Sequence, residues 1–216
     1  MGHRHPGLFL TARPCHSDPQ PQKDQPMTDH PPRLAATLTA IDAANAADPD
    51  TGEGTAAALL YGQRMTAELD RIFPDASEVL RIAARGQHVE RWLLPRDSYP
   101  EGRAGYLEWR REQGRRHAAR LQGFMAEAGY DAAAQEQVGR MLRKEGLKRD
   151  RQVQALEDVI CITFLKWYFL PFAEGRDAEE LDRIVTRTAL KMSPEGRARV
   201  LREFDLPEPF VAAFRA

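Results

Sequence analysis

The feature that most constrains the fold is a helical periodicity that runs from residue 34 to the end of the chain. Apolar residues recur every three or four positions, and no segment alternates apolar and polar residues as a strand would. Residues typical of helix starts separate the segments. They are Thr55, Asp75, Asp131, Asp177 and Ser193. The pattern predicts an all-α fold of at least seven helices.

The first 32 residues differ from the rest of the chain. They are rich in Pro, His, Gln and Asp and lack the continuous apolar core of a secretory signal. We therefore predict a disordered extension over residues 1–32 and a single all-helical domain over residues 33–216. Because Met27 opens a more ordinary start, residues 1–26 are a hypothetical upstream translation artefact.

Charge and apolar content limit the partners. The formal net charge of −1 disfavours nucleic acid or an anionic membrane surface as a partner. The longest apolar stretch, Val159–Phe172, is interrupted by Lys166 and is too short to span a bilayer. With only Cys15 and Cys161, a reducing compartment is indicated, which predicts a cytoplasmic protein. Monomer and homodimer both stay open, with Val159–Phe172 as a candidate interface.

Several polar residues lie on inward faces of predicted helices. His117 shares an inward stripe with Tyr106, and His88 ends an apolar helix. Glu157 and Asp158 lie on the most apolar predicted helix, Arg151–Phe169. Burial of such groups costs free energy unless they are paired, hydrogen-bonded or bound to a metal. Hydrogen-bonded histidines and carboxylate–arginine pairs are the plain structural alternative.

Arginines and aromatic residues interleave between residues 85 and 120, around a proline-containing loop at 92–102. Guanidinium groups match phosphate and carboxylate geometry, and aromatic faces stack on bases or guanidinium groups. An anion-binding cleft is therefore predicted, against the alternative of a solvated helix face produced by a general arginine bias. The candidate ligand-binding residues of this segment are Arg91, Arg96, Arg103, Tyr106 and Trp109, with Tyr99 as a candidate proton donor or acceptor.

Three motifs carry a family resemblance. Residues 83–92 (AARGQHVERW), 95–100 (PRDSYP) and 103–110 (RAGYLEWR), together with Leu156–Val159, resemble an uncharacterised bacterial and fungal domain family. This resemblance covers nearly all of residues 34–207 and supplies no mechanism.

A second resemblance is to the HD-domain metal-dependent phosphohydrolases. Residues 61–65 (YGQRM) are similar to that family's first His-Ser-x-Arg-Val turn, and residues 83–88 to its helix ending in a His-Asp pair. The chain departs from the pattern, because Tyr61 stands at the first histidine, Gln87-His88 replaces the His-Asp pair, and Arg143-Lys144 occupies the region of a further histidine. Tyr, Gln and Lys are poor ligands for the ions of that site.

The second resemblance implies an HD-like helical bundle and a metal-dependent phosphohydrolase acting on a phosphorylated or nucleotide-like small molecule. It implies one divalent metal ion, with His88, His117 and Asp158 as its ligands. Glu157 and Tyr99 join His88 and Asp158 as catalytic candidates, and Arg64 and Lys144 join the ligand-binding residues. The alternative is an anion- or nucleotide-binding, or RNA-associated, module without metal and without turnover.

Overall fold

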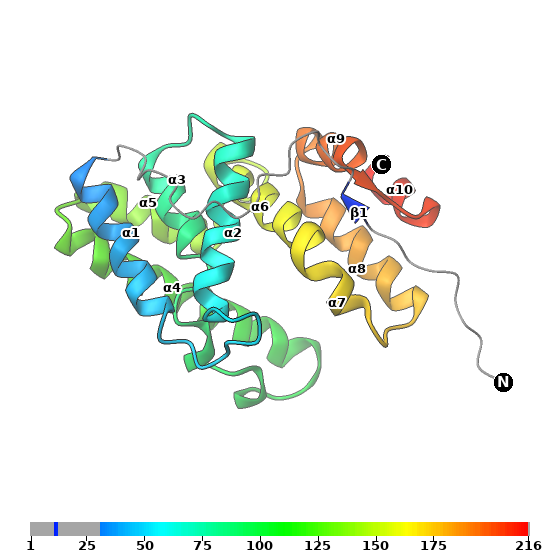
Figure 1. Cartoon of the computed structure of the whole chain (residues 1–216), viewed down its shortest axis with the longest axis horizontal. Helices are drawn as coiled ribbons and strands as arrows, with labels where there is room; N and C mark the ends of the chain where they lie inside the picture. The colour runs from blue at the N-terminus through cyan, green and yellow to red at the C-terminus, as the bar shows by residue number, and fades with distance from the viewer. Residues whose placement is uncertain (1–10, 13–30, 216) are drawn as a thin grey trace. The chain divides into compact units, whose positions relative to one another are not determined.

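The computed structural model describes residues 11–12 and 31–215 (Figure 1). Ten α-helices dominate these residues, so the all-α prediction is confirmed. The chain divides into two compact units, Met27–Val159 and Met1–Pro26 with Ile160–Ala216. A single domain over residues 33–216 stays a prediction. No helix of the described residues combines the length and apolar content that a membrane span requires.

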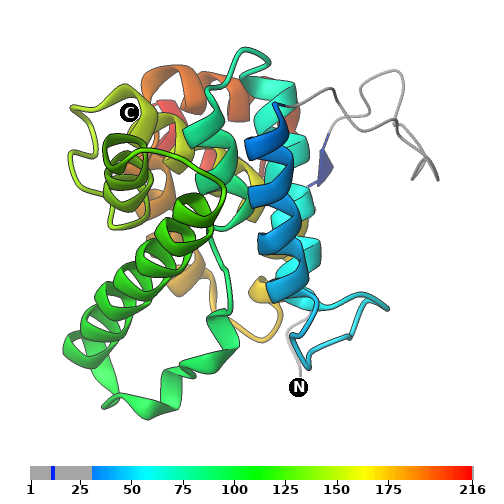
Figure 2. The same ribbon diagram turned by 90° about the vertical axis from the view of Figure 1, so that its left-hand side faces the viewer.

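The larger unit is built around its longest helix, α4, which packs against α5 and α1 (Figure 2). Helix α3 packs against α1, α2 and α5. Their inward residues close a dry core, in which Ile41, Ile82 and Leu121 are fully buried. The elements are α1 (Pro32–Asn45), α2 (Ala57–Ile72), α3 (Glu78–Arg85), the 3-10 turns η1 (Arg91–Leu93) and η2 (Arg96–Ser98), α4 (Gly102–Glu127), α5 (Ala132–Leu142) and the first part of α6 (Arg151–Thr163).

The helix starts of the larger unit follow the expected chemistry with two changes. Asp131 accepts a hydrogen bond from the Ala134 amide, as predicted for a cap. Asp75 was predicted to cap α3, but the hydroxyl of Ser77 accepts the Leu80 amide instead. Thr55 was predicted to cap α2, and there the carboxylate of Asp48 accepts the Ala58 amide. The cap of α3 thus lies two residues after the predicted one, and the cap of α2 comes from a residue seven positions before the predicted one.

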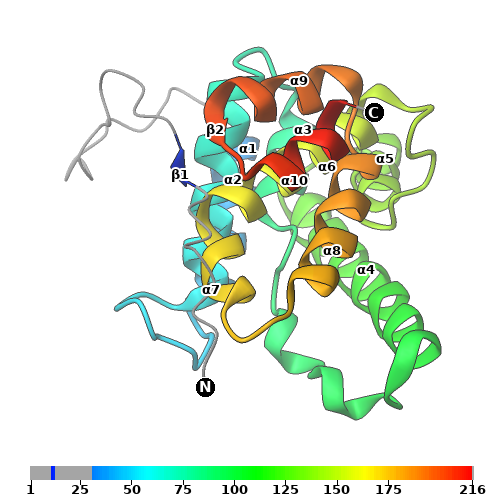
Figure 3. The ribbon, with the colours of Figure 1, turned by 90° about the vertical axis from the view of Figure 1, so that its right-hand side faces the viewer.

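The smaller unit contains the remaining elements (Figure 3). Helix α10 packs against both α8 and α9, and Phe169 and Val185 are buried. One helix was predicted over Arg151–Phe169, but a π-helical turn, η3, follows α6 at Phe164. The bounds are η3 (Phe164–Tyr168), α7 (Phe169–Ala173), α8 (Ala178–Lys191), α9 (Pro194–Glu203) and α10 (Glu208–Arg215).

A two-residue pairing in the smaller unit was not predicted. Strand β1 (Thr11–Ala12) pairs antiparallel with β2 (Phe204–Asp205). These two residues belong to the segment predicted to be disordered, and residues 1–10 and 13–30 lie outside the described residues. The expected caps of this unit are confirmed, since Asp177 accepts the Glu180 amide and Ser193 accepts the Gly196 amide.

Two glycines let the elements of the larger unit approach closely. A Cβ at Gly62 of α2 would lie 2.7 Å from the carbonyl oxygen of Arg85, at the end of α3. A Cβ at Gly114 of α4 would lie 3.1 Å from the carbonyl oxygen of Leu142, at the end of α5. Both contacts are shorter than ordinary van der Waals packing permits, so a larger residue would push these elements apart. The close approach places α2, α4 and the end of α5 around the turn that follows α3.

Candidate functional site

Side chains from separate elements of the larger unit meet around His88, in the turn after α3. We call this group the His88 cluster. Its members are Tyr61 from α2, His88 and Arg91 from the turn, Arg110 and His117 from α4, and Lys144 from the turn after α5.

His88 is half-buried and lies between two rings. The Tyr61 ring stacks on it with centroids 3.9 Å apart and planes 19° apart, and the His117 ring lies 6.3 Å away. Burial lowers the pKa of His88 well below its ordinary value, and the positive charges of Arg91 and Lys144 lower it further. At neutral pH this imidazole is therefore uncharged and can accept a proton.

Two guanidinium groups of the cluster act on each other without a counter-ion. Burial lowers the pKa of Arg91, and the charge of Arg110 lowers it too, while Tyr61 and Tyr106 act in the opposite direction. Within residues 31–215, neither Arg91 nor Arg110 forms an ion pair with a carboxylate. Their contacts are aromatic: Arg91 lies over the Trp109 ring at 4.5 Å and Arg110 over the Tyr106 ring at 5.8 Å.

Lys144 is held by a strained backbone and a buried partner. Its φ of 57° lies in the left-handed region, at the position after a helix where Gly is usual. The amide of Lys144 donates to the Met141 carbonyl, and the next amide donates to the Arg140 carbonyl, which completes a Schellman motif. The Lys144 ammonium lies 2.5 Å from the carboxylate of Glu157, whose side chain is 2% exposed. A non-glycine residue in this conformation costs free energy.

His117 is the most deeply buried titratable group of the cluster, at 4% exposure. Burial, and to a lesser extent the charges of Arg91 and Arg116, lower its pKa to about 3, against the opposing effect of a hydrogen bond with the Gln87 backbone. His117 also lines a surface pocket of about 370 Å³, together with Val89, Glu90, Arg116, Ala119 and Arg120.

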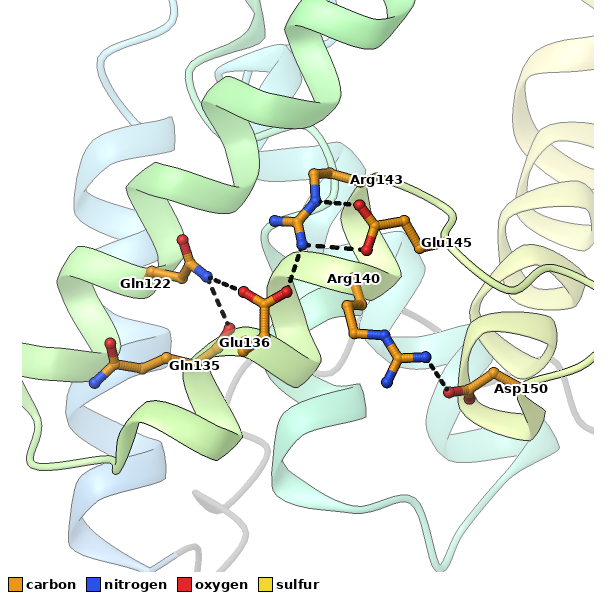
Figure 4. A network of polar contacts seen from close by, with 7 residues as sticks. All are labelled: Gln122, Gln135, Glu136, Arg140, Arg143, Glu145 and Asp150. Atoms are coloured by element: carbon orange, nitrogen blue, oxygen red, sulfur yellow. Dashed lines mark hydrogen bonds and ion pairs between the residues drawn. The ribbon is translucent and has the colours of Figure 1, made fainter.

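A contrasting group of charges lies along α5 and in the turn that follows it, as Figure 4 shows. There Arg143 donates to both Glu136 and Glu145, and Arg140 pairs with Asp150 at 3.5 Å. We call these residues, with Gln122 and Gln135, the α5 network. In this network each arginine has a carboxylate partner, whereas in the His88 cluster Arg91 and Arg110 have none among the described residues.

The other predicted site residues lie apart from this geometry or serve local structure. Arg64 forms a bidentate pair with Glu53. Arg96 donates to the carbonyl oxygens of Tyr99 and Pro100 and so holds the shape of its own loop. Tyr99 itself is half-buried, and Arg103 is exposed on the first turn of α4. The structure brings together His88, Arg91, His117 and Lys144, with Trp109 and Glu157 around them. The predicted inward position of Tyr106 is wrong, because its side chain is exposed on α4, where it contacts Arg110 and Trp109.

The predicted metal ligands are not gathered into one group. His88 and His117 are neighbours, but Asp158 is buried and accepts a hydrogen bond from Gln154 at 3.0 Å. Across residues 11–12 and 31–215, no group of three or more His, Cys, Asp or Glu side chains is arranged to hold a metal ion. The donor set therefore does not fit the divalent ion that the phosphohydrolase resemblance implies.

Four residues of the site were not among the predicted candidates: Tyr61, Gln87, Arg110 and Gln113. The amide nitrogen of Gln113 donates to the carbonyl oxygens of Arg91 at 3.0 Å and Leu94 at 2.9 Å, which fixes the loop against α4. The signal for Gln113 was its place one turn before His117 on the inward stripe. For Tyr61, the signal was its place at the first histidine of the phosphohydrolase pattern.

Fold and site together define an all-helical protein with a cation-rich, partly buried cluster. Residues 35–213 match a family described as a domain of unknown function, DUF4202, and the chain belongs to that family. The match confirms the resemblance to an uncharacterised family. No curated protein and no solved structure matches the chain significantly. The HD-like arrangement therefore stays a prediction.

Proposed function

We propose that the chain binds an anionic small molecule, through a phosphate or comparable oxyanion, at the His88 cluster. One observation carries the proposal: the positive charges of Arg91, Arg110 and Lys144 all act on His88, and the two arginines have no carboxylate partner among the described residues. Like charges brought together in a partly buried site cost free energy, which a bound anion would offset. Guanidinium groups suit this role because they donate two parallel hydrogen bonds to an oxyanion.

The test is anion binding at fixed ionic strength. Inorganic phosphate and pyrophosphate should raise the melting temperature of the wild type relative to chloride, because a ligand that binds only the native state stabilises it. Calorimetric titration of Arg91→Met and Arg110→Met should show affinity reduced by about 10-fold or more, the loss expected for one charge-assisted hydrogen bond.

Arg111→Met is the matched control. Arg111 follows Arg110 on α4, is exposed, and donates to the Leu107 carbonyl of its own helix. This variant should bind phosphate like the wild type. The proposal fails if no anion stabilises the wild type, or if Arg91→Met and Arg110→Met keep full affinity.

Turnover is a second candidate, favoured by the uncharged state of His88. A neutral imidazole beside a bound phosphate ester can act as a general base toward water or a ligand hydroxyl. In that case His88→Gln should keep phosphate affinity and lose hydrolysis of a phosphate-ester panel followed by phosphorus NMR. Absence of hydrolysis by the wild type would leave binding as the function.

A further inference from the structure

A second group of charges lines the surface pocket between α4 and the turn after α3. The pocket has a volume of about 370 Å³, at the small end of the roughly 300–1,000 Å³ that small-molecule sites span. Its lining consists of Val89, Glu90, Arg116, His117, Ala119 and Arg120. Neither Arg91 nor Arg110 belongs to this lining, so the pocket offers a site with charged groups of its own.

One wall of the pocket is held in place by an ion pair. The Arg120 guanidinium lies 3.0 Å from Oε1 of Glu90 and over the Phe124 ring at 4.2 Å. The backbone of Glu90 is fixed as well, because its amide donates to Oδ1 of the buried Asn45. The Glu90 side chain is still 25% exposed. A molecule that enters the pocket therefore meets a carboxylate that is already positioned.

Two charged groups of the lining have bonding capacity left over. Arg116 lies one turn before Arg120 on α4 and is exposed. In the part of the chain that the structure describes, it forms no ion pair with Glu90 or with any other carboxylate. Glu90 contacts Arg120 through Oε1 alone, so within residues 31–215 its Oε2 is an acceptor without a partner. Arg116 and Glu90 thus line one pocket without contacting each other, and a molecule with a charge of each sign can contact both.

We propose that this pocket binds a small zwitterion, an amino acid or a related aminocarboxylate. Its carboxylate accepts two parallel hydrogen bonds from the Arg116 guanidinium, and its ammonium group donates to Oε2 of Glu90. Val89 and Ala119 provide an apolar lining for the carbon atoms between the two charges. A simple carboxylate would use Arg116 alone and a simple amine would use Glu90 alone, so both should bind more weakly. The proposal does not depend on the anion site at the His88 cluster.

The experiment compares ligands of one chain length by titration of the full protein, followed by NMR. At matched ionic strength, 4-aminobutyrate, butyrate and butylamine share a four-carbon chain and differ only in their charged ends. Glycine and 6-aminohexanoate vary the separation of the two charges. The best of the three aminocarboxylates should bind about tenfold more tightly than butyrate or butylamine, as expected for one additional charge-assisted hydrogen bond.

Variants locate the two ends of the ligand. Arg116→Met should lower affinity for that aminocarboxylate about tenfold and leave affinity for butylamine unchanged. Glu90→Gln should lower it by a similar factor and should not weaken butyrate binding. Arg115→Met is the matched control, because Arg115 is the neighbouring residue on α4, is 64% exposed, pairs with Glu112 and lies outside the pocket lining. It should bind like the wild type. Circular dichroism of each variant establishes that the helices are intact before its affinity is used.

The outcomes separate this site from the proposed function. Equal affinity for butyrate and every aminocarboxylate would overturn the zwitterion assignment. Full aminocarboxylate affinity in Arg116→Met would show that binding takes place elsewhere and would overturn the site. If no aminocarboxylate binds, Arg116 belongs to a solvated helix face and the proposal fails, while phosphate binding at the His88 cluster is unaffected. Arg91→Met and Arg110→Met should keep aminocarboxylate affinity and lose only phosphate affinity.

Discussion

The His88 cluster and the α5 network use the same residue types in opposite ways. In the network, Arg143 contacts Glu136 and Glu145, and all three side chains lie at the surface, so solvent screens their charges. In the cluster, Arg91 and Arg110 face aromatic rings and each other, beside histidines that burial keeps neutral. Charges that balance internally stabilise a fold slightly. Charges left unbalanced and partly buried cost stability, which indicates a role in binding.

The largest effect is expected where the cluster does have a counter-ion. Lys144→Met leaves the carboxylate of Glu157, 2% exposed, without its ammonium partner. Removing one member of a buried ion pair costs about 3 kcal/mol, so urea denaturation should show a loss of that order. Arg140→Met in the α5 network is the matched control and should cost at most about 1 kcal/mol. Equal losses in the two variants would mean that the two regions do not differ in burial energetics.

The sequence predicted the helices and the caps that lie next to them, but not the contacts between residues distant in the chain. Helical periodicity and local caps are short-range signals, so the all-α fold and the caps at Asp131, Asp177 and Ser193 followed from neighbouring residues. Asp48, which caps α2 from ten residues away, gives no such local signal.

The site residues also fall into two groups: those that local spacing indicates and those that depend on contacts between distant elements. Inward spacing found His88 and His117, but which arginine of a rich segment lacks a carboxylate depends on contacts between elements distant in sequence. Arg64 and Arg96 were assigned to a ligand because their internal partners, Glu53 and the backbone of the 96–102 loop, could not be read from composition. Activity stays a prediction of the phosphohydrolase resemblance, whereas the donor set of the described residues does not fit the metal ion that this resemblance implies.

The second largest effect is expected on lowering the pH, which should reduce the free energy of unfolding through the His88 cluster and not through the α5 network. The pKa of His117 is about 3 in the folded protein and about 6.5 when unfolded, so between these values only the unfolded chain takes up the proton. The stabilising contribution is complete above pH 6.5 and is lost as pH falls below it. The loss is about 1.4 kcal/mol per pH unit, or about 2 kcal/mol between pH 6.5 and 5. The shift of His88 acts in the same direction.

Denaturation curves measured at pH 6.5 and pH 5 test this. His117→Gln should reduce the dependence in that range to the part that His88 contributes, because one of the two titrating histidines is gone. Arg143→Gln in the α5 network should leave it as in the wild type, since carboxylates whose pKa is lowered, such as Glu145, lose their contribution only at lower pH. A wild type equally stable at both pH values would contradict the neutral state of His117.

A smaller effect concerns backbone strain at Lys144. Lys144→Gly and Lys144→Ala both remove the ion pair, but only Gly relieves the left-handed φ of 57°. The glycine variant should be more stable than the alanine variant by about 1 kcal/mol. Lys148, with φ of 71°, offers the matched position, and Gly should exceed Ala there by a similar amount. A Gly advantage at position 148 alone would show that the turn after α5 relaxes once Lys144 is lost.

The smallest effect has opposite signs in the two regions. Arg110→Gln removes one of two like charges that have no carboxylate partner in the described residues, so without ligand it should stabilise the protein by about 0.5 kcal/mol. Arg143→Gln removes a paired charge and should destabilise it by a similar amount, about 0.5 kcal/mol. In saturating phosphate the order for Arg110 should reverse, because only the wild type gains the full binding free energy. Thermal denaturation of both variants with and without phosphate measures all four values. If Arg110→Gln destabilises the free protein as Arg143→Gln does, then Arg110 has an internal role, and the unbalanced charge that motivates the anion site is absent.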